Sequence, residues 1–236
     1  MDGLQINVIA SGSMGNCYAV YDGETGLLIE AGIPIIKIKQ SLGFGLSTVS
    51  AVLISHEHMD HAKAVKDLMK YGIDVYMSAG TAAVLNISGH RLHVVGSGEV
   101  FEIGSYEIMA FPTKHDAREP LGYFIQSRHN GLNLLFFTDT YYLEYIFEDV
   151  DYIMAECNYS KAILSKNLRD GVISKVLYER IYRSHMSLET LKEFLKAMDL
   201  KKLKQIYLLH LSDTNSDADL FKDEIQRLTG AEVITT

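Results

Sequence analysis

The sequence predicts an α/β protein in which two β-sheets pack together with helices on the outside. Short apolar runs of strand character recur along the whole chain, and segments with helical spacing fall among them and again towards the C-terminus. This order of elements is typical of two packed sheets covered by helices. The 236 residues contain no repeat, linker or low-complexity segment, so we expect a single domain over residues 1–236.

The first part of the chain supplies most of the predicted strands. A small, polar loop at residues 11–16 separates the first two, and His-Asn-Gly at 129–131 is a favoured hairpin turn. Helices are expected at residues 34–42, 62–71 and 79–85. Strands are expected at residues 4–10, 17–21, 27–30, 51–54, 74–77, 91–95, 99–103, 106–111, 123–127 and 132–138.

The second part of the chain alternates strands with longer helices. Strands are expected at residues 152–156, 205–209 and 232–235, and helices at residues 174–182, 188–198 and 217–228. In the second of these helices one face carries only apolar side chains, namely Leu191, Phe194, Leu195 and Met198. This stripe predicts a helix that faces the core, in preference to one that lines a cofactor site.

Composition limits the classes of function. The chain is 47% hydrophobic and 22% charged, which is ordinary for a globular protein, and no apolar run approaches the ~20 residues of a membrane-spanning helix. The N-terminus lacks a basic segment followed by an apolar one, so we expect no signal peptide and a cytoplasmic protein. Cys17 and Cys157 are expected to be buried, reduced thiols. The net charge of −8 argues against tight wrapping of duplex nucleic acid, although bound divalent ions would reverse the local field.

The most informative segment, residues 52–61, reads VLISHEHMDH. A buried strand leads into it, and if the strand continues, His56 and His58 point the same way because strand side chains alternate. Asp60 and His61 then stand where a helix should start. Histidine and carboxylates are common metal ligands, so this loop can offer a His pair to one ion and an Asp-His pair to a second. We prefer this reading to a chance cluster of surface histidines.

Four further strands end in residues that could bind a metal ion. Ligands at strand ends lie on a rigid scaffold, which a catalytic site needs. One such histidine would more often be an ordinary surface residue, but the repetition of the pattern argues against chance. The residues at these strand ends are His115, Asp139, Glu156 and His210. Three other histidines lack acidic neighbours and are expected on the surface: His90, His93 and His129.

The motif His56-x-His58-x-Asp60-His61 resembles the signature of the metallo-β-lactamase fold. The resemblance implies an αββα sandwich of two mixed β-sheets packed face to face, and two sites for divalent ions. It implies that the first site consists of His56, His58, His115 and Asp139, and the second of Asp60, His61, His210 and the shared Asp139. Glu30 stands where this family usually has Asp, a residue that supports the His loop by hydrogen bonds and does not bind metal.

Several further segments are similar to one family within this fold, the YycJ (WalJ) type. They follow in order along nearly the whole chain, at residues 10–16, 115–123, 138–140, 156–158, 185–187 and 210–215, whereas residues 158–183 fit least well. The resemblance implies a DNA exonuclease or a general metal-dependent hydrolase, more distantly similar to tRNA-processing RNase Z. In RNase Z-like enzymes a histidine in a comparable stretch is a general acid, which implies this role for His185. The alternative is a histidine with only structural work at a helix entry.

Substrate contacts are predicted in three places. Residues 161–183 carry six basic side chains against two acidic ones, and Lys175 and Arg180 are expected to contact phosphate. The alternative for such a charge run is a solvated face. Ser13 and Asn16 belong to a small-residue loop whose N–H groups could cradle an oxyanion. In the segment after the last histidine, Ser212 and Asn215 are further candidates.

We predict a two-metal phosphodiesterase or nuclease that acts on DNA or another nucleic acid, with His185 protonating the leaving oxygen and Asp60 orienting or deprotonating the nucleophile. Zinc suits the histidine-rich sites, and manganese or iron is also permitted. The alternatives are a phosphodiesterase of small cyclic nucleotides, a thioester hydrolase similar to glyoxalase II, and a metal-stabilised binding domain without turnover. A nucleic acid or nucleotide is the expected substrate, no membrane association is expected, and a homodimer is left open.

Overall fold

The computed structural model describes residues 3–236 and divides into two compact units. Unit 1 comprises Met1–Pro112 and Ala117–Asn133, and unit 2 comprises Thr113–Asp116 and Leu134–Thr236. Within residues 3–236, no helix combines the length and the apolar character that crossing a membrane requires. The expectation of one domain over the whole chain stays a prediction.

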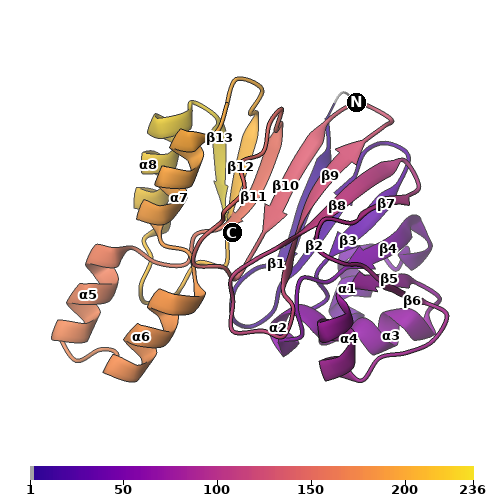
Figure 1. The fold of residues 1–236 in the computed structure, drawn as a ribbon, viewed down its shortest axis with the longest axis horizontal. Coiled ribbons are helices and arrows are strands. Elements are labelled where there is room, and N and C mark those ends of the chain that lie inside the picture. Colours follow the sequence, from indigo (N-terminus) through magenta and orange to yellow (C-terminus); the bar gives the residue numbers. More distant parts are fainter. Residues whose placement is uncertain (1–2) are drawn as a thin grey trace. The chain divides into compact units, whose positions relative to one another are not determined.

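Unit 1 is built on a six-stranded mixed sheet with the strands in chain order (Figure 1). The second strand is antiparallel to both the first and the third, and the third to the sixth are parallel. The sequence predicted all six strands, with small shifts at their ends. They are β1 (Gln5–Ala10), β2 (Cys17–Tyr21), β3 (Gly26–Ile29), β4 (Val49–Leu53), β5 (Asp74–Met77) and β6 (Leu92–Val94).

Short helices cover one face of this sheet (Figure 1). Apolar side chains of α1, α3 and α4 pack there against Leu28, Val52 and Val75, which alternate with residues of the opposite face along their strands. Both faces of the central strands are therefore buried, as their continuous apolar runs indicate. The elements are α1 (Ile35–Ser41), η1 (Leu46–Thr48), α2 (Met59–Ala62), α3 (Val65–Lys70) and α4 (Ala79–Leu85).

The prediction of one helix over residues 62–71 was wrong at its start. The chain forms a single turn, α2, and then breaks before α3. In a continuous helix the carbonyl of Asp60 would accept a hydrogen bond from the N–H of Ala64. Instead, the Asp60 carbonyl accepts from the N–H of Asn16 at 2.7 Å, and the Ala64 N–H donates to the Ala31 carbonyl at 2.8 Å. Contacts from distant segments therefore separate α2 from α3.

The opposite face of the six-stranded sheet packs, within unit 1, against an antiparallel meander of β7 (Val100–Ile103), β8 (Tyr106–Pro112) and β9 (Leu121–Ser127). The fully buried Tyr123 donates its hydroxyl to the carbonyl of Ile54 at 2.7 Å. The N–H of Leu121 donates to the carbonyl of Ser55 at 2.9 Å. These bonds fix β9 directly beneath the loop that carries His56.

A buried carboxylate joins the two layers of unit 1 at the turn between β2 and β3. Asp22 Oδ2 accepts hydrogen bonds from the hydroxyls of Ser105 and Ser127, both at 2.6 Å. Its Oδ1 accepts from the N–H groups of Glu24 at 2.9 Å and Thr25 at 2.8 Å. Burial raises the pKa of Asp22, but the four hydrogen bonds outweigh burial and lower that pKa below its ordinary value. Asp22 is therefore ionised at neutral pH and contributes to stability.

Unit 2 contains four parallel strands in the order β10-β11-β12-β13. Every residue of β10 and β11 is buried, in keeping with their apolar runs. Figure 1 shows α7 and α8 lying side by side along these strands. The elements are β10 (Asn133–Phe137), β11 (Tyr152–Glu156), β12 (Gln205–Leu209), β13 (Glu232–Thr235), α7 (Leu188–Ala197) and α8 (Ala218–Thr229).

Two further helices of unit 2, α5 (Lys161–Arg169) and α6 (Lys175–Ser184), contact each other and form the α5–α6 hairpin. They have a small core of their own, composed of Tyr159, Leu164, Ile173 and Ile181. The sequence predicted α6 but missed α5. Ser160 and Ser174 begin the two helices, and each accepts a hydrogen bond from a backbone N–H of the first turn.

Candidate metal centre

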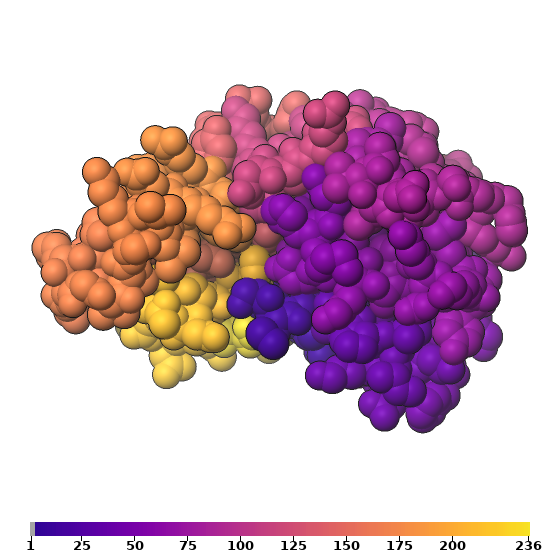
Figure 2. All heavy atoms as spheres, turned by 90° about the horizontal axis from the view of Figure 1, so that it is seen from below, coloured from indigo at the N-terminus to yellow at the C-terminus, as the bar shows by residue number. Residues whose placement is uncertain are grey.

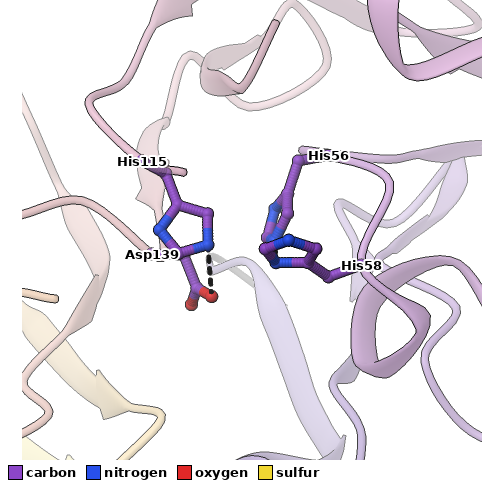
Figure 3. A group of neighbouring side chains, drawn as sticks. All are labelled: His56, His58, His115 and Asp139. Atoms are coloured by element: carbon purple, nitrogen blue, oxygen red, sulfur yellow. Dashed lines mark hydrogen bonds and ion pairs between the residues drawn. The ribbon is translucent and has the colours of Figure 1, made fainter. Parts of the chain in front are cut away.

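In unit 1 the predicted metal ligands lie on the loop that follows β4. His56 is buried, and its Nδ1 lies 2.8 Å from the hydroxyl of Ser55. Its Nε2 lies 3.1 Å from Nδ1 of His58, and the two rings meet edge to face, as Figure 3 shows. Two ring nitrogens that face each other in this way can turn their lone pairs to a common ion. The loop therefore brings His56 and His58 together, as their spacing suggested.

The second pair of unit 1 donors lies on α2, immediately after this loop. His61 is fully buried, and its ring centroid lies 4.2 Å from that of His56. Its Nε2 lies 3.5 Å from Oδ2 of Asp60, whose side chain is 27% exposed. Unit 1 therefore gathers three imidazoles and one carboxylate in one place. Nitrogen and oxygen donors in this combination suit zinc, manganese or iron.

Glu30 supports this group from the end of β3. The residue is fully buried and has a positive φ of 64°. Its carboxylate accepts a hydrogen bond from the Ser55 N–H at 3.3 Å and lies 3.6 Å from Nδ1 of His61. A carboxylate beside one ring nitrogen of a histidine orients the other nitrogen, as is common around metal sites. The longer Glu side chain thus still reaches the His loop.

In unit 2 the candidate donors follow three adjacent parallel strands. Asp139 comes just after β10, Glu156 is the last residue of β11, and His210 comes just after β12. The carboxyl ends of parallel strands meet at one edge of a sheet, which brings these residues together. Nδ1 of His210 lies 2.7 Å from Oδ1 of Asp139 and 3.4 Å from Oε1 of Glu156. With His185, the three place one potential ligand atom each within 4.8 Å of the others.

His115 also belongs to unit 2, on the short segment after β8. Its Nδ1 lies 3.0 Å from the carbonyl oxygen of Ser184, which makes Nδ1–H the donor. The Nε2 lone pair then faces Oδ2 of Asp139 at 3.4 Å, the contact dashed in Figure 3. The last residue of α6 therefore fixes the tautomer that a metal ligand needs.

Glu156 has more contacts than the sequence indicates, which marks it only as a strand-end residue that could bind a metal ion. It is fully buried. Its carboxylate lies 2.5 Å from Nδ1 of His185 and accepts from the N–H groups of Thr140 at 3.0 Å and Met186 at 3.1 Å. It therefore holds both the segment after Asp139 and the histidine at the end of α6. The signal was present: an acidic residue closing an otherwise apolar strand must have partners when buried.

The electrostatics of unit 2 favour a cation. Burial lowers the pKa of His210, but Asp139 and Glu156 raise it well above its ordinary value. Burial likewise lowers the pKa of His185, and Glu156 reverses the direction. For His115 burial prevails and lowers the pKa, which favours the neutral imidazole that binds metal ions. The buried carboxylates of Asp139 and Glu156 favour a positive charge on the neighbouring imidazoles. A divalent ion would neutralise these carboxylates equally well, so the donor set fits a divalent ion.

The predicted substrate-contacting residues have varied environments. Lys175 and Arg180 are on α6, with side chains 80% and 65% exposed. Arg180 lies 3.9 Å from Asp116, beside His115. Figure 2 shows the orange surface of the α5–α6 hairpin on which these residues lie. Ser13 is exposed on the loop after β1.

Two of the predicted substrate contacts are amides with partners inside the protein. Asn16 is fully buried, and its amide bonds to the loop around it and to the Asp60 carbonyl. Asn215 is 2% exposed; its Nδ2 donates to the hydroxyl of Ser212 at 3.2 Å, and its Oδ1 accepts from Asn167 at 2.9 Å. Cys17 and Cys157 are free and buried, as predicted.

Two layers of strands with outer helices, and histidines and acids gathered at strand ends, define a metallo-β-lactamase-fold protein. Residues 28–211 match the family model described as a β-lactamase superfamily domain, and the chain belongs to this superfamily. It is 27% identical to exodeoxyribonuclease YycJ of Bacillus anthracis over 96% of this chain and 89% of the relative. It is 29% identical to exodeoxyribonuclease WalJ of Streptococcus pneumoniae serotype 2 over 92% and 85%.

Solved structures agree with this fold. The metallo-β-lactamase-fold protein YhfI of Bacillus subtilis is similar with a TM-score of 0.76 at 16% identity, covering 99% of this chain and 96% of that one. Human tRNase Z, short form, is similar with a TM-score of 0.66 at 12% identity, covering 98% and 95%. The predicted fold, two mixed β-sheets with helices, is confirmed, and so is the resemblance to the YycJ (WalJ) type. The chain is a metal-dependent hydrolase.

Proposed function

We propose that this chain is a two-metal phosphodiesterase of nucleic acid, with DNA the foremost substrate. The curated relatives named exodeoxyribonucleases support DNA, and the donors of both units support two divalent ions. In this proposal His56, His58, His115 and Asp139 hold one ion. The other is held by Asp60, His61, His210 and the shared Asp139. Zinc is the first choice for so many imidazoles, with manganese or iron as alternatives.

The observation that carries the proposal is the contact between His185 and Glu156. With Nδ1 engaged by the buried carboxylate at 2.5 Å, His185 has only Nε2 to offer a substrate. In phosphodiester hydrolysis the leaving group is a basic alkoxide that needs a proton. In thioester hydrolysis the leaving group is a thiolate, which departs without one. A buried carboxylate that favours a protonated histidine beside the candidate ligands therefore supports phosphodiester over thioester hydrolysis.

In the mechanism the protein residues do four things. His115, fixed by the Ser184 carbonyl, keeps a neutral Nε2 towards Asp139. Asp60 orients the attacking water or removes its proton. His185 gives a proton from Nε2 to the departing oxygen, and Glu156 stabilises the positive charge of the protonated His185 before this transfer. When bound, the divalent ions supply an activated water and neutralise charge on the phosphate. Lys175 and Arg180 on the exposed α6 contact further phosphates of a polynucleotide.

A substrate panel tests this function. The purified protein, loaded separately with zinc and manganese, would be assayed on single- and double-stranded DNA, RNA, cyclic mononucleotides and a thioester, with chelator-treated protein as control. We expect metal-dependent cleavage of DNA. Hydrolysis of cyclic mononucleotides alone would replace the polymer substrate by a small one. Turnover of the thioester without any phosphodiester would refute the proposal.

The proposal also includes a cytoplasmic location, which fits the relatives named exodeoxyribonucleases. The homodimer stays a prediction. Sedimentation of the purified protein at several concentrations measures the oligomeric state directly.

A further inference from the structure

The loop between β1 and β2, residues Ser11–Asn16, is turned towards the protein and not only towards solvent. Its last residue, Asn16, has no exposed surface. Asn16 Oδ1 accepts hydrogen bonds from the N–H of Gly12 at 2.9 Å and the hydroxyl of Tyr18 at 3.0 Å. Because a backbone N–H can only donate, the bond from Gly12 assigns the amide orientation. Nδ2 must then point the other way.

On that side, Nδ2 of Asn16 reaches the helix turn that carries two candidate ligands. It lies 3.2 Å from the carbonyl oxygens of both Gly12 and Asp60, and 3.2 Å from Nε2 of His61. An amide has two N–H bonds, and the two carbonyl oxygens can accept both. The Asn16 amide therefore contacts this turn both at the Asp60 carbonyl and at the His61 ring.

The backbone around Asn16 strengthens the same connection. The Asn16 N–H donates to the Asp60 carbonyl at 2.7 Å, and the Asn16 carbonyl accepts from the Gly32 N–H at 2.8 Å. The Ala31 N–H donates to the carbonyl of His61 at 2.7 Å. A Cβ on Gly32 would lie 1.6 Å from the Asp60 carbonyl oxygen, so only glycine allows this approach. Two segments that are distant in sequence are thus bonded to one turn of helix.

This locking explains why α2 ends after a single turn. The Asp60 and His61 carbonyls, which would extend the helix, are bound by Asn16 and Ala31 instead. Asp60 and His61 consequently sit on a turn whose orientation is set from outside the helix. Asn16 supplies both the backbone bond and the side-chain bond to the Asp60 carbonyl.

We propose that Asn16 is a positioning residue for the second metal site, which holds Asp60 and His61 in the orientation that binds the ion. This inference rests on the proposed two-ion function. It assigns to the loop Ser11–Asn16 a role in metal binding in place of contact with substrate at Asn16. Asn16 would then act as a residue that orients metal ligands. Removal of such a residue usually weakens metal affinity about 10- to 100-fold.

Metal titration of the apoprotein tests the proposal. Stepwise uptake of zinc, measured against a chromophoric chelator, should show two ions in the wild type. Asn16→Ala should retain one ion with its original affinity and bind the other about 10- to 100-fold more weakly. Asn16→Asp should weaken the same ion at least as much, because a carboxylate oxygen would then face two carbonyl oxygens and could not donate to the Asp60 carbonyl. Met14→Ala, on the same loop and 90% exposed, should bind both ions as the wild type does.

The readouts separate positioning from simple destabilisation. Circular dichroism of each apoprotein reports folding, and a folded Asn16→Ala variant that loses one ion selectively supports the proposal. Unchanged affinity for both ions, or equal weakening of both, would overturn it. If Asn16→Ala does not fold, Tyr18→Phe is the alternative variant, because it removes only the hydroxyl that donates to Asn16 Oδ1. We expect the same ion to bind more weakly, in smaller degree. Wild-type affinity of Tyr18→Phe for both ions would again overturn the proposal. Wild-type protein that binds two ions but cleaves no phosphodiester would refute the proposed function alone.

Discussion

The buried carboxylate of Asp22 gives a prediction that depends only on the fold. Asp22→Ala removes the acceptor for four hydrogen bonds, and three of their donors, on Thr25, Ser105 and Ser127, belong to buried residues. At about 1–1.5 kcal/mol for each donor left without a partner, the free energy of unfolding should fall by about 3–4.5 kcal/mol. The fourth donor, Glu24, is exposed and regains a bond to water, so it adds little.

Asp22→Asn is the finer test because it keeps the shape of the side chain. The amide oxygen can still accept from the N–H groups of Glu24 and Thr25, while the amide nitrogen must replace an oxygen that accepts from two hydroxyls. We expect a loss of about 1–2 kcal/mol at pH 7. The pKa of Asp22 is lowered in the folded state, so its contribution is complete above the unfolded value of about 4 and disappears as pH falls through the folded value.

The assay is urea unfolding followed by circular dichroism, with a chelator in every sample so that bound metal does not contribute. The difference between wild type and Asp22→Asn should shrink as the pH is lowered below about 4, since a neutral Asp resembles Asn. Asp67→Ala, in an exposed pair with Lys70, is the matched control and should change stability by less than about 0.5 kcal/mol. The reasoning would be refuted if Asp22→Asn were as stable as the wild type at pH 7. It would also be refuted if the difference in free energy of unfolding between them did not change with pH.

Three predictions concern the proposed function. Asp139→Ala should reduce the ion content below two per chain by elemental analysis, and full retention of two ions would contradict a shared carboxylate. Charge reversal at Lys175 and Arg180 should raise KM for a polynucleotide and flatten its dependence on salt, whereas Lys222→Glu on α8 should not. His185→Ala should keep its metal and lose about 10²–10⁴ in rate on an ordinary phosphodiester, but much less on a nitrophenyl ester; equal losses would exclude a proton donor.

The sequence predicted the strands well because nearly all of them are buried on at least one face, so their apolar runs are continuous or alternate cleanly. It also predicted that histidines and acids would follow strands. It could not show which contacts would shape the backbone there. Glu30, Asp139 and His210 all have positive φ, at 64°, 46° and 55°, which costs non-glycine residues roughly 1 kcal/mol or more each. Only the surrounding fold can impose such a conformation.

The two errors in helix prediction have the same origin. The break after α2 comes from hydrogen bonds to Asn16 and Ala31, which are far away in sequence. The helix α5 buries few of its side chains, chiefly Leu164 and Asn167, so its apolar periodicity is weak. It is stabilised by a serine cap and by packing of Leu164 with Ile173 and Ile181. Local patterns report neither kind of long-range contact.

The small separate core of the α5–α6 hairpin has a consequence for how an ion could leave the protein. Segments with few buried apolar contacts open locally at much lower free energy than whole domains, so amide hydrogens of α5 and α6 should exchange well before those of β10 to β12. Each opening at the end of α6 would break the bond from His115 to the Ser184 carbonyl and would loosen His185. The rate at which the ion leaves this centre would then depend on local opening of the α5–α6 hairpin. The rate of metal exchange should therefore be similar to that of hydrogen exchange in α6 and much faster than global unfolding.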